Sequence, residues 1–216
     1  IITCGGNGGM LLLDDEDRRD RALMLRRWGR RSEVQFFGSR RSDHTFWEDL
    51  DGIEYDNQFI FDELGWNFEP SEMGAAFGLA QLDKLDANLA RRRHLFDRYT
   101  AWGRDRTDAF GLPRTTADLE TAWLGYPLLI RADAGFTRPD LQQFLDQRGI
   151  DTRTIWTGNA ARQPMLAGRT VRVPDDGLPN SDEIMARGVL LPLSHAITDD
   201  THDVVLAALD EFLALR

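Results

Sequence analysis

Cysteine is almost absent from the sequence, since Cys4 is the single one among 216 residues. No intrachain disulfide can form, and a metal or iron–sulfur site built from several cysteines of this chain is excluded. Long apolar runs are missing as well, because no window reaches the roughly 18 consecutive apolar residues that a membrane-spanning helix needs. The first residues also lack the basic-then-apolar layout of a signal peptide. We therefore expect a cytoplasmic protein that does not enter a membrane.

Positive charge is in short supply too. The chain has 36 acidic and 26 basic residues, which gives a formal net charge of −10. Such a surface repels a phosphate backbone, so nucleic acid is not expected as a partner. Hydrophobic residues make up 42% of the sequence and are spread along it, which is enough for a packed core. The composition predicts one large or two small globular domains.

The first residues look like the middle of a protein. The chain opens at Ile1 without an initiator methionine, and we expect it to be part of something longer. Ile1 to Thr3 and Met10 to Leu13 are predicted to be short strands joined by a tight turn at Gly5 to Gly9. These glycines would also allow backbone amides to face an anion, but their spacing is not the dinucleotide-binding fingerprint. A plain hairpin turn is the favoured interpretation.

Two helices are indicated in the first hundred residues. Asp14 and Asp15 are suitable caps for a helix with apolar residues at helical spacing, and Gly29 is predicted to end it. Arg30 to Asp51 shows no sustained period and is predicted to be a long loop. From Ser71 to Tyr99 apolar residues keep to one side for about eight turns. We expect one long helix that connects two lobes.

The second half of the chain alternates between strand and helix signals. Strands are predicted at 121–131, 150–156 and 189–193, and helices begin at Thr137, at Asp182 and after the capping residue Thr198. This order predicts an α/β lobe with an antiparallel or mixed sheet.

Few side chains offer covalent or metal chemistry. Lys84 is the only lysine, and it lies on the polar side of the predicted long helix, where a solvated surface residue is expected rather than a Schiff-base nucleophile. His44, His94, His195 and His202 show no metal-ligand spacing, and we expect them at the surface or at helix ends. His195, in a turn after a strand, is the best placed of the four for a functional role.

One loop carries a more suggestive set of side chains. It follows a predicted strand that contains Arg153, and it combines an arginine fork with two side-chain amides at Asn159, Arg162 and Gln163. These groups suit the binding of a diphosphate or a sugar hydroxyl. The alternative is that the arginines pair with some of the many acidic residues on the surface, which contributes little energy.

Several segments together resemble the vitamin B6-dependent sugar aminotransferases of the DegT/StrS family. The most distinctive block is Gly65 to Phe68 followed by EMGAAFGLAQLDKL at Glu72 to Leu85, and Thr3 to Asp15 and Arg27 to Arg30 are also similar to family segments. The resemblance covers nearly the whole chain. It implies a PLP-dependent transferase fold of type I, α/β and aspartate-aminotransferase-like, in a homodimer. Residues 1–85 would be the C-terminal part of the large cofactor-binding domain with the start of the connecting helix, and 86–216 the small C-terminal α/β domain.

Within that family the likeness is closer to the nucleotide-sugar 3-dehydratases. These enzymes remove the C3 hydroxyl of 4-keto-6-deoxyhexoses in deoxysugar and polysaccharide biosynthesis. The similar features are Tyr55 and Asp56 ahead of Gly65, the loop Gly158 to Pro164, and Leu178 to Asp182. Two alternatives stay open: a true sugar aminotransferase on the same fold, and a non-catalytic dimer partner or sensor that keeps the fold without the chemistry.

The resemblance also implies which residues take part. Pyridoxal 5′-phosphate or pyridoxamine 5′-phosphate is the expected cofactor, and its aldimine lysine, or the histidine that replaces it in the dehydratases, is expected immediately before Ile1. The chain alone would then hold no catalytic residue and be inactive. Asn67 matches an asparagine that reaches the cofactor phosphate of the neighbouring subunit. Substrate contacts are expected, by resemblance, from Asn159, Arg162, Arg153 and His195.

Some 3-dehydratases carry an iron–sulfur cluster. Part of its cysteines would fall in the segment that corresponds to Arg30 to Asp51, which contains none. We therefore expect no iron–sulfur cluster and no other metal, with a nucleotide sugar as the small-molecule partner.

Overall fold

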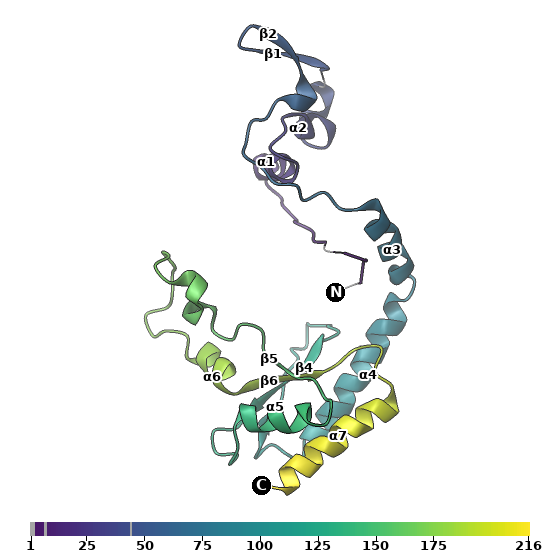
Figure 1. Ribbon diagram of the computed structural model, residues 1–216, viewed down its shortest axis with the longest axis vertical. Coiled ribbons are helices and arrows are strands. Elements are labelled where there is room, and N and C mark those ends of the chain that lie inside the picture. Colours follow the sequence, from purple (N-terminus) through teal and green to yellow (C-terminus); the bar gives the residue numbers. More distant parts are fainter. Residues whose placement is uncertain (1–2, 7, 44) are drawn as a thin grey trace. The chain divides into compact units, whose positions relative to one another are not determined.

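The computed structural model describes residues 3–6, 8–43 and 45–216. They divide into two compact units, one up to Asp83 and the other from Lys84 to Arg216, and Figure 1 shows the elements of each. The predicted first strand lies partly outside the described residues, as do Asn7 of the glycine turn and His44. No helix within the described ranges is both long and apolar enough to cross a membrane.

The strand predicted at Met10 to Leu13 is wrong. These four residues have no regular secondary structure, and their side chains are exposed. A strand requires a neighbour for its backbone hydrogen bonds, and within the described residues none pairs with this run. An apolar run of four residues therefore does not define a strand by itself.

The first predicted helix is confirmed as α1 (Glu16–Arg26). The Asp15 side chain caps it by accepting a hydrogen bond from the Arg18 amide at 2.9 Å. Gly29 follows with a φ of +87°. A Cβ at this position would lie 1.7 Å from the carbonyl oxygen of Glu63, so both the backbone conformation and the packing require glycine here.

The segment predicted as a long loop, Arg30 to Asp51, contains short elements instead. It folds into α2 (Ser32–Phe36), η1 (Arg41–Asp43) and β1 (Trp47–Leu50), and β1 pairs with β2 (Ile53–Asp56) in an antiparallel hairpin. Asp51 and Gly52 form its turn with positive φ angles, as Asp-Gly turns do. The prediction failed because each strand has only four residues, half of them acidic, and only β2 alternates between apolar and acidic side chains. η2 (Asn57–Phe59) follows directly.

Ion pairs and hydrogen bonds, rather than an apolar core, hold this first unit together. Val34 and Ile60 are its buried hydrophobic residues among those described. Glu33, only 1% exposed, accepts hydrogen bonds from Arg26 at 3.0 Å and Arg27 at 3.2 Å. Removing either arginine would leave this buried carboxylate partly unpaired, which is costly.

The single connecting helix predicted from Ser71 to Tyr99 is two helices. α3 (Glu72–Leu82) ends at a turn formed by Asp83 and Lys84, and α4 (Leu85–Gly103) begins after it. The apolar spacing continues through the break, so the periodicity alone does not reveal it. α3 belongs to the first unit and α4 to the second. Lys84 is exposed, as expected.

The second unit contains the antiparallel sheet. Its strands are β3 (Phe110–Gly111), β4 (Gly125–Ile130), β5 (Arg153–Thr154) and β6 (Gly188–Pro192), in the order β3-β4-β6-β5. The predictions for β4 and β6 are confirmed, whereas the strand predicted at 150–156 has only the two residues of β5. In the central pair, Gly125 lies opposite Pro192.

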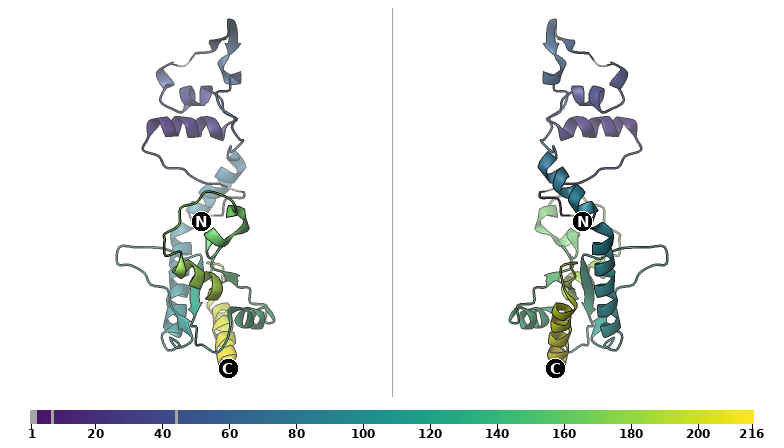
Figure 2. Two further views of the ribbon diagram at one scale, coloured as in Figure 1. Left: turned by 90° about the vertical axis from the view of Figure 1, so that its left-hand side faces the viewer. Right: turned by 90° about the vertical axis from the view of Figure 1, so that its right-hand side faces the viewer.

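Two of the three predicted helices begin where expected, directly after a capping residue, whereas the third begins three residues before the predicted Asp182 and has no side-chain cap. α5 (Arg138–Asp146) has a complete capping box between Thr137 and Asp140, α6 (Pro179–Arg187) starts on a proline, and α7 (Asp199–Ala214) is capped by Thr198. α7 packs against both α4 and α5 (Figure 1). The long segment between β5 and α6 projects from the sheet (Figures 1 and 2).

The core of this unit combines aliphatic and aromatic side chains and lies between the sheet and the helices. Its largest buried side chains include Tyr99, Tyr126, Phe110 and Phe212. The Tyr99 and Tyr126 rings stack with centroids 4.9 Å apart, and the Tyr99 hydroxyl donates to the Pro192 carbonyl at 3.0 Å. This core joins α4, β4, β6 and α7 into one packed body.

His202 is at a helix end, one of the two expected positions, but its side chain is buried in that core rather than at the surface. It lies in the first turn of α7, yet its side chain is fully buried, and its ring meets the Tyr99 ring with centroids 4.2 Å apart. Neither ring nitrogen has a hydrogen-bond partner among the described residues. Burial, aided by the positive charge of Arg98, lowers the pKa of His202 to about 4. The neutral ring is therefore the form that the fold favours.

Acid should weaken the second unit through His202. The unfolded chain binds a proton at the ordinary pKa of 6.5 and the folded chain only near pH 4, so the free energy of unfolding should fall as the pH drops through this window. This difference between the pKa values of His202 in the unfolded and folded chain corresponds to about 3 kcal/mol in the free energy of unfolding. We expect His202→Leu to reduce the change in the free energy of unfolding between pH 7 and pH 4.5, measured by urea denaturation at each pH. The exposed His195→Gln should keep the slope of the unaltered protein, and an equally steep slope in His202→Leu would contradict the prediction.

Candidate functional site

The side chain of Asn159 joins the loop that follows β5 to α6 through a hydrogen bond. This residue is 4% exposed; its Oδ1 accepts a hydrogen bond from the Ala161 amide at 3.0 Å and caps the short helix η3 (Ala160–Arg162). Its Nδ2 donates to Asp182 Oδ1 at 2.6 Å. Both polar ends of the amide are thus used within the protein, which gives Asn159 a structural role in holding the loop.

Arg162 meets the same carboxylate as Asn159. Its Nε lies 2.5 Å from Asp182 Oδ1 and its Nη2 2.7 Å from Oδ2, a two-pronged geometry that fixes the guanidinium plane. The hydrogen bond from Arg162, followed by that from Asn159, lowers the pKa of Asp182 to about 2. We refer to Asn159, Arg162 and Asp182 as the Asp182 cluster.

The Asp182 cluster agrees with the plainer of the two sequence interpretations, in which arginine pairs with an acidic residue. Arg162 remains 62% exposed in its side chain, so the pairing orients the guanidinium without burying it. A positioned and exposed arginine retains the ability to meet an anion from solvent. Substrate contact by Asn159 and Arg162 therefore stays a prediction, with the geometry of Arg162 now defined.

The other two predicted substrate residues lie on separate elements of the second unit. Arg153 is on β5, where its guanidinium pairs with Asp151 and 70% of its side chain is exposed. His195 lies in the exposed turn between β6 and α7. The structure thus brings Asn159 and Arg162 together, and gives Arg153 and His195 no contact with the Asp182 cluster among the described residues.

Asn67 belongs to the first unit and lies on its surface. Backbone hydrogen bonds hold the segment around it against the end of α1: the Trp66 amide donates to Leu25 at 2.8 Å and the Phe68 amide to Arg26 at 2.8 Å. The Asn67 side chain is exposed, and its Oδ1 accepts a weak hydrogen bond from the Glu69 amide at 3.4 Å. Its Nδ2 has no partner among the described residues. A donor amide is therefore presented at the surface, where another molecule can approach it.

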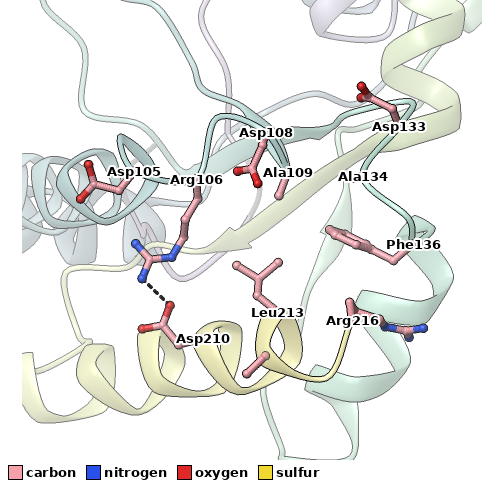
Figure 3. A pocket seen from close by; sticks show the side chains of 11 residues that line it. Asp105, Arg106, Asp108, Ala109, Asp133, Ala134, Phe136, Asp210, Leu213 and Arg216 are labelled. Atoms are coloured by element: carbon pink, nitrogen blue, oxygen red, sulfur yellow. Dashed lines mark ion pairs between the residues drawn. The ribbon is translucent and has the colours of Figure 1, made fainter.

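A hollow in the second unit lies away from the Asp182 cluster. It has a volume of about 780 Å³ and is lined largely by charged side chains, with Arg106 and Asp210 paired at 2.7 Å (Figure 3). None of the predicted site residues lines it. Among the described residues no group of three or more His, Cys, Asp or Glu side chains is arranged to hold a metal ion.

Asp182 is the member of the candidate site that sequence reasoning left without a role. It entered as the predicted start of a helix and as part of the family-like segment Leu178 to Asp182. The available signal is its place in the first turn of α6, where an acidic residue is favoured by the helix dipole. That signal predicts an acidic residue but not its partners, which lie 20 and 23 residues earlier in the chain.

Comparison with known proteins decides the family. Residues 1–210 match the DegT/DnrJ/EryC1/StrS aminotransferase family. The chain belongs to this family. The α/β fold of PLP-dependent type I transferases that the resemblance implied is thereby confirmed.

Individual relatives of this DegT-family chain are similar over almost its whole length. It is 33% identical over 97% of its residues to a dTDP-4-dehydro-2,6-dideoxy-D-glucose 3-dehydratase of Saccharopolyspora spinosa, covering 45% of that protein. It is 28% identical over 98% to the lipopolysaccharide biosynthesis protein RfbH of Salmonella typhimurium, covering 48%. The chain thus spans about half the length of the curated relatives it matches.

A solved structure supports the same fold. The Escherichia coli GDP-4-keto-6-deoxy-D-mannose-3-dehydratase with bound hydrated PLP superposes with a TM-score of 0.71 at 23% identity, over 91% of this chain and 48% of that one. At this identity the likeness concerns the fold alone.

The Asp182 cluster can be tested by titration. We expect the Asp182 carboxyl to titrate near pH 2 in ¹³C NMR, because the Arg162 and Asn159 hydrogen bonds favour its charged form. Arg162→Gln should raise that pKa toward the ordinary 3.8. The matched variant Arg153→Gln, which removes an exposed arginine of the same loop region, should leave it unchanged. An Asp182 that titrates at 3.8 in the unaltered protein would show that the cluster does not form.

Proposed function

We propose that this chain works in a PLP- or PMP-dependent enzyme that acts on nucleotide-linked 4-keto-6-deoxyhexoses and removes the C3 hydroxyl, as a 3-dehydratase. The observation that carries this proposal is the 33% identity, over 97% of the chain, to the Saccharopolyspora 3-dehydratase. The similarity to two GDP-4-keto-6-deoxy-D-mannose 3-dehydratases, from Escherichia coli and Yersinia pseudotuberculosis, supports it at 28% identity over 70% of the chain.

A sugar aminotransferase is the second candidate. The same family includes the dTDP-3-amino-3,4,6-trideoxy-alpha-D-glucose transaminase of Streptomyces venezuelae, 26% identical over 89% of this chain. The residue at the cofactor-attachment position separates the two functions: a lysine favours amino transfer, and a histidine favours loss of the hydroxyl. A non-catalytic dimer partner or sensor is the third candidate, and it would not retain the cofactor.

The residues of this chain suit the cofactor. When bound, pyridoxal phosphate draws electron density from the carbon attached to it and so makes a neighbouring proton easier to remove. The exposed Asn67 amide has a donor available for a phosphate oxygen. Since a phosphate group is well matched by N–H donors, Asn67 would hold the phosphate in the site of a second subunit, which makes the enzyme a homodimer with shared active sites.

The residues of the second unit would serve the substrate. Arg162 offers an oriented and exposed guanidinium that suits the diphosphate of a nucleotide sugar. Arg153 and His195 offer further exposed donors, while Asn159 keeps the loop in place through Asp182. In this proposal the chain contributes binding and orientation.

The function is tested with the full-length protein, the cofactor and a nucleotide-linked 4-keto-6-deoxyhexose, with glutamate as amino donor. We expect the visible absorbance of bound cofactor and, by mass spectrometry, a product that lacks the C3 hydroxyl. A product that carries a new amino group would establish the aminotransferase instead. Failure to retain any cofactor would reject both enzymatic functions and leave the non-catalytic partner.

The role of Asn67 has its own test. Asn67→Ala in the full-length dimer should weaken retention of the cofactor about tenfold, because one charge-assisted hydrogen bond to the phosphate is lost. Equilibrium dialysis followed by cofactor absorbance measures this. Gln58→Ala removes another exposed amide of the same unit and should have no effect. Equal retention by Asn67→Ala and the unaltered protein would remove Asn67 from the cofactor site.

A further inference from the structure

Trp156 has a left-handed backbone conformation and a largely exposed side chain. Its φ is +46°, in the left-handed region that bulky residues avoid, and its side chain is 71% exposed. Trp28 also has a positive φ, but its ring lies under the Arg30 guanidinium, 4.6 Å from the ring centroid. Trp156 has no such ring or guanidinium contact among the described residues. Its indole is therefore exposed to solvent, and the residue that carries it has a positive φ angle.

The backbone around this indole is firmly held. The Trp156 carbonyl accepts a hydrogen bond from Thr154 Oγ1 at 3.0 Å, and the Gly158 amide donates to Ile155 at 3.0 Å. A Cβ at Gly158 would lie 2.5 Å from the Cβ of Met185, so this turn packs directly on α6. A ligand that stacks on Trp156 would meet a backbone that is already ordered, which lowers the entropy cost of binding.

Two exposed arginines lie near Trp156 along the chain. Arg153 precedes Trp156 by three residues and is itself largely exposed. Arg162 follows, and the loop folds back so that the side chain of Gln163 donates to the Thr157 carbonyl at 3.0 Å. The residue after Trp156 therefore touches the residue after Arg162. An exposed indole in one short segment with two exposed guanidinium groups is suited to a ligand that has a planar ring next to phosphates.

We propose that Trp156 is the surface on which the base of a nucleoside-diphosphate-linked substrate stacks, with Arg153 and Arg162 beside it for the diphosphate. This assignment rests on the proposed function, and it adds the residue that receives the nucleoside end. The base, rather than the hexose, belongs on this ring because the hexose must reach the cofactor, whereas an exposed indole can serve the far end of the substrate. Stacking is tolerant of the kind of base, because every base has a π face.

The test uses the full-length protein and two probes without a hexose, dTDP and GDP, with affinities measured by titration calorimetry. Trp156→Ala should raise the dissociation constant of at least one probe about tenfold or more, the range expected when base stacking is lost. Trp156→Phe keeps a stacking surface and should stay within about threefold of the unaltered protein. Val204→Ala removes an exposed apolar side chain on α7, away from this loop, and should change nothing.

A second variant controls for the possibility that Trp156→Ala disturbs the fold of the loop. Trp156→Asn also removes the ring, and asparagine tolerates a positive φ, so it should weaken nucleotide binding as much as Trp156→Ala. Unchanged affinity for both probes in both variants would overturn the proposal, as would a loss seen only with the complete nucleotide sugar, which would place the hexose on the ring.

Cofactor absorbance separates this result from the proposed function. If all variants retain the cofactor and nucleotide affinity is unaffected, the stacking role of Trp156 is wrong while the enzyme assignment stands. If the unaltered protein retains no cofactor yet nucleotide affinity falls in Trp156→Ala and Trp156→Asn, the enzyme assignment is wrong while the stacking role stands.

Discussion

A single carboxylate, that of Asp182, joins the loop between β5 and α6 to the helix that follows it. It receives the fork of Arg162 and the amide of Asn159, and it lies in the first turn of α6, where the helix dipole favours negative charge. Because its pKa is about 2, it stays charged throughout the physiological range. The loop conformation that exposes Trp156 and orients Arg162 is built around this charge.

The two units are stabilised in different ways. The second has one continuous apolar core, so its loops can carry exposed functional groups on a rigid base. The first relies on arginine–carboxylate pairs around Glu33 and exposes many large apolar side chains, among them Trp47, Phe59, Trp66 and Phe68. Exposed apolar surface of this extent is typical of an interface. It agrees with the proposal that Asn67, which lies between Trp66 and Phe68 in the sequence, works in contact with a second subunit.

Much of the fold was predictable where the signal is local. Asp15, the Thr137–Asp140 box and Thr198 each mark a helix start, since a cap depends only on residues a few positions away. The predictions failed where the local pattern is short or ambiguous, or where a distant strand decides. The two strands of the β1–β2 hairpin have four residues each, half of them acidic, and the break at Asp83 and Lys84 leaves the apolar spacing intact. β5 is limited to the two residues that pair with the distant β6.

The sequence by itself determined the helix caps, the alternation of strands and helices in the second half, and the motifs that led to the DegT/StrS resemblance. Each of these depends only on residues that are close together in the chain. Only the tertiary structure decided that Arg162 and Asn159 share Asp182, that His202 is buried while Trp156 is exposed, and that Asn67 faces solvent. The physical reason is that a charge partner and a degree of burial depend on which distant elements pack together, and no local pattern carries that information.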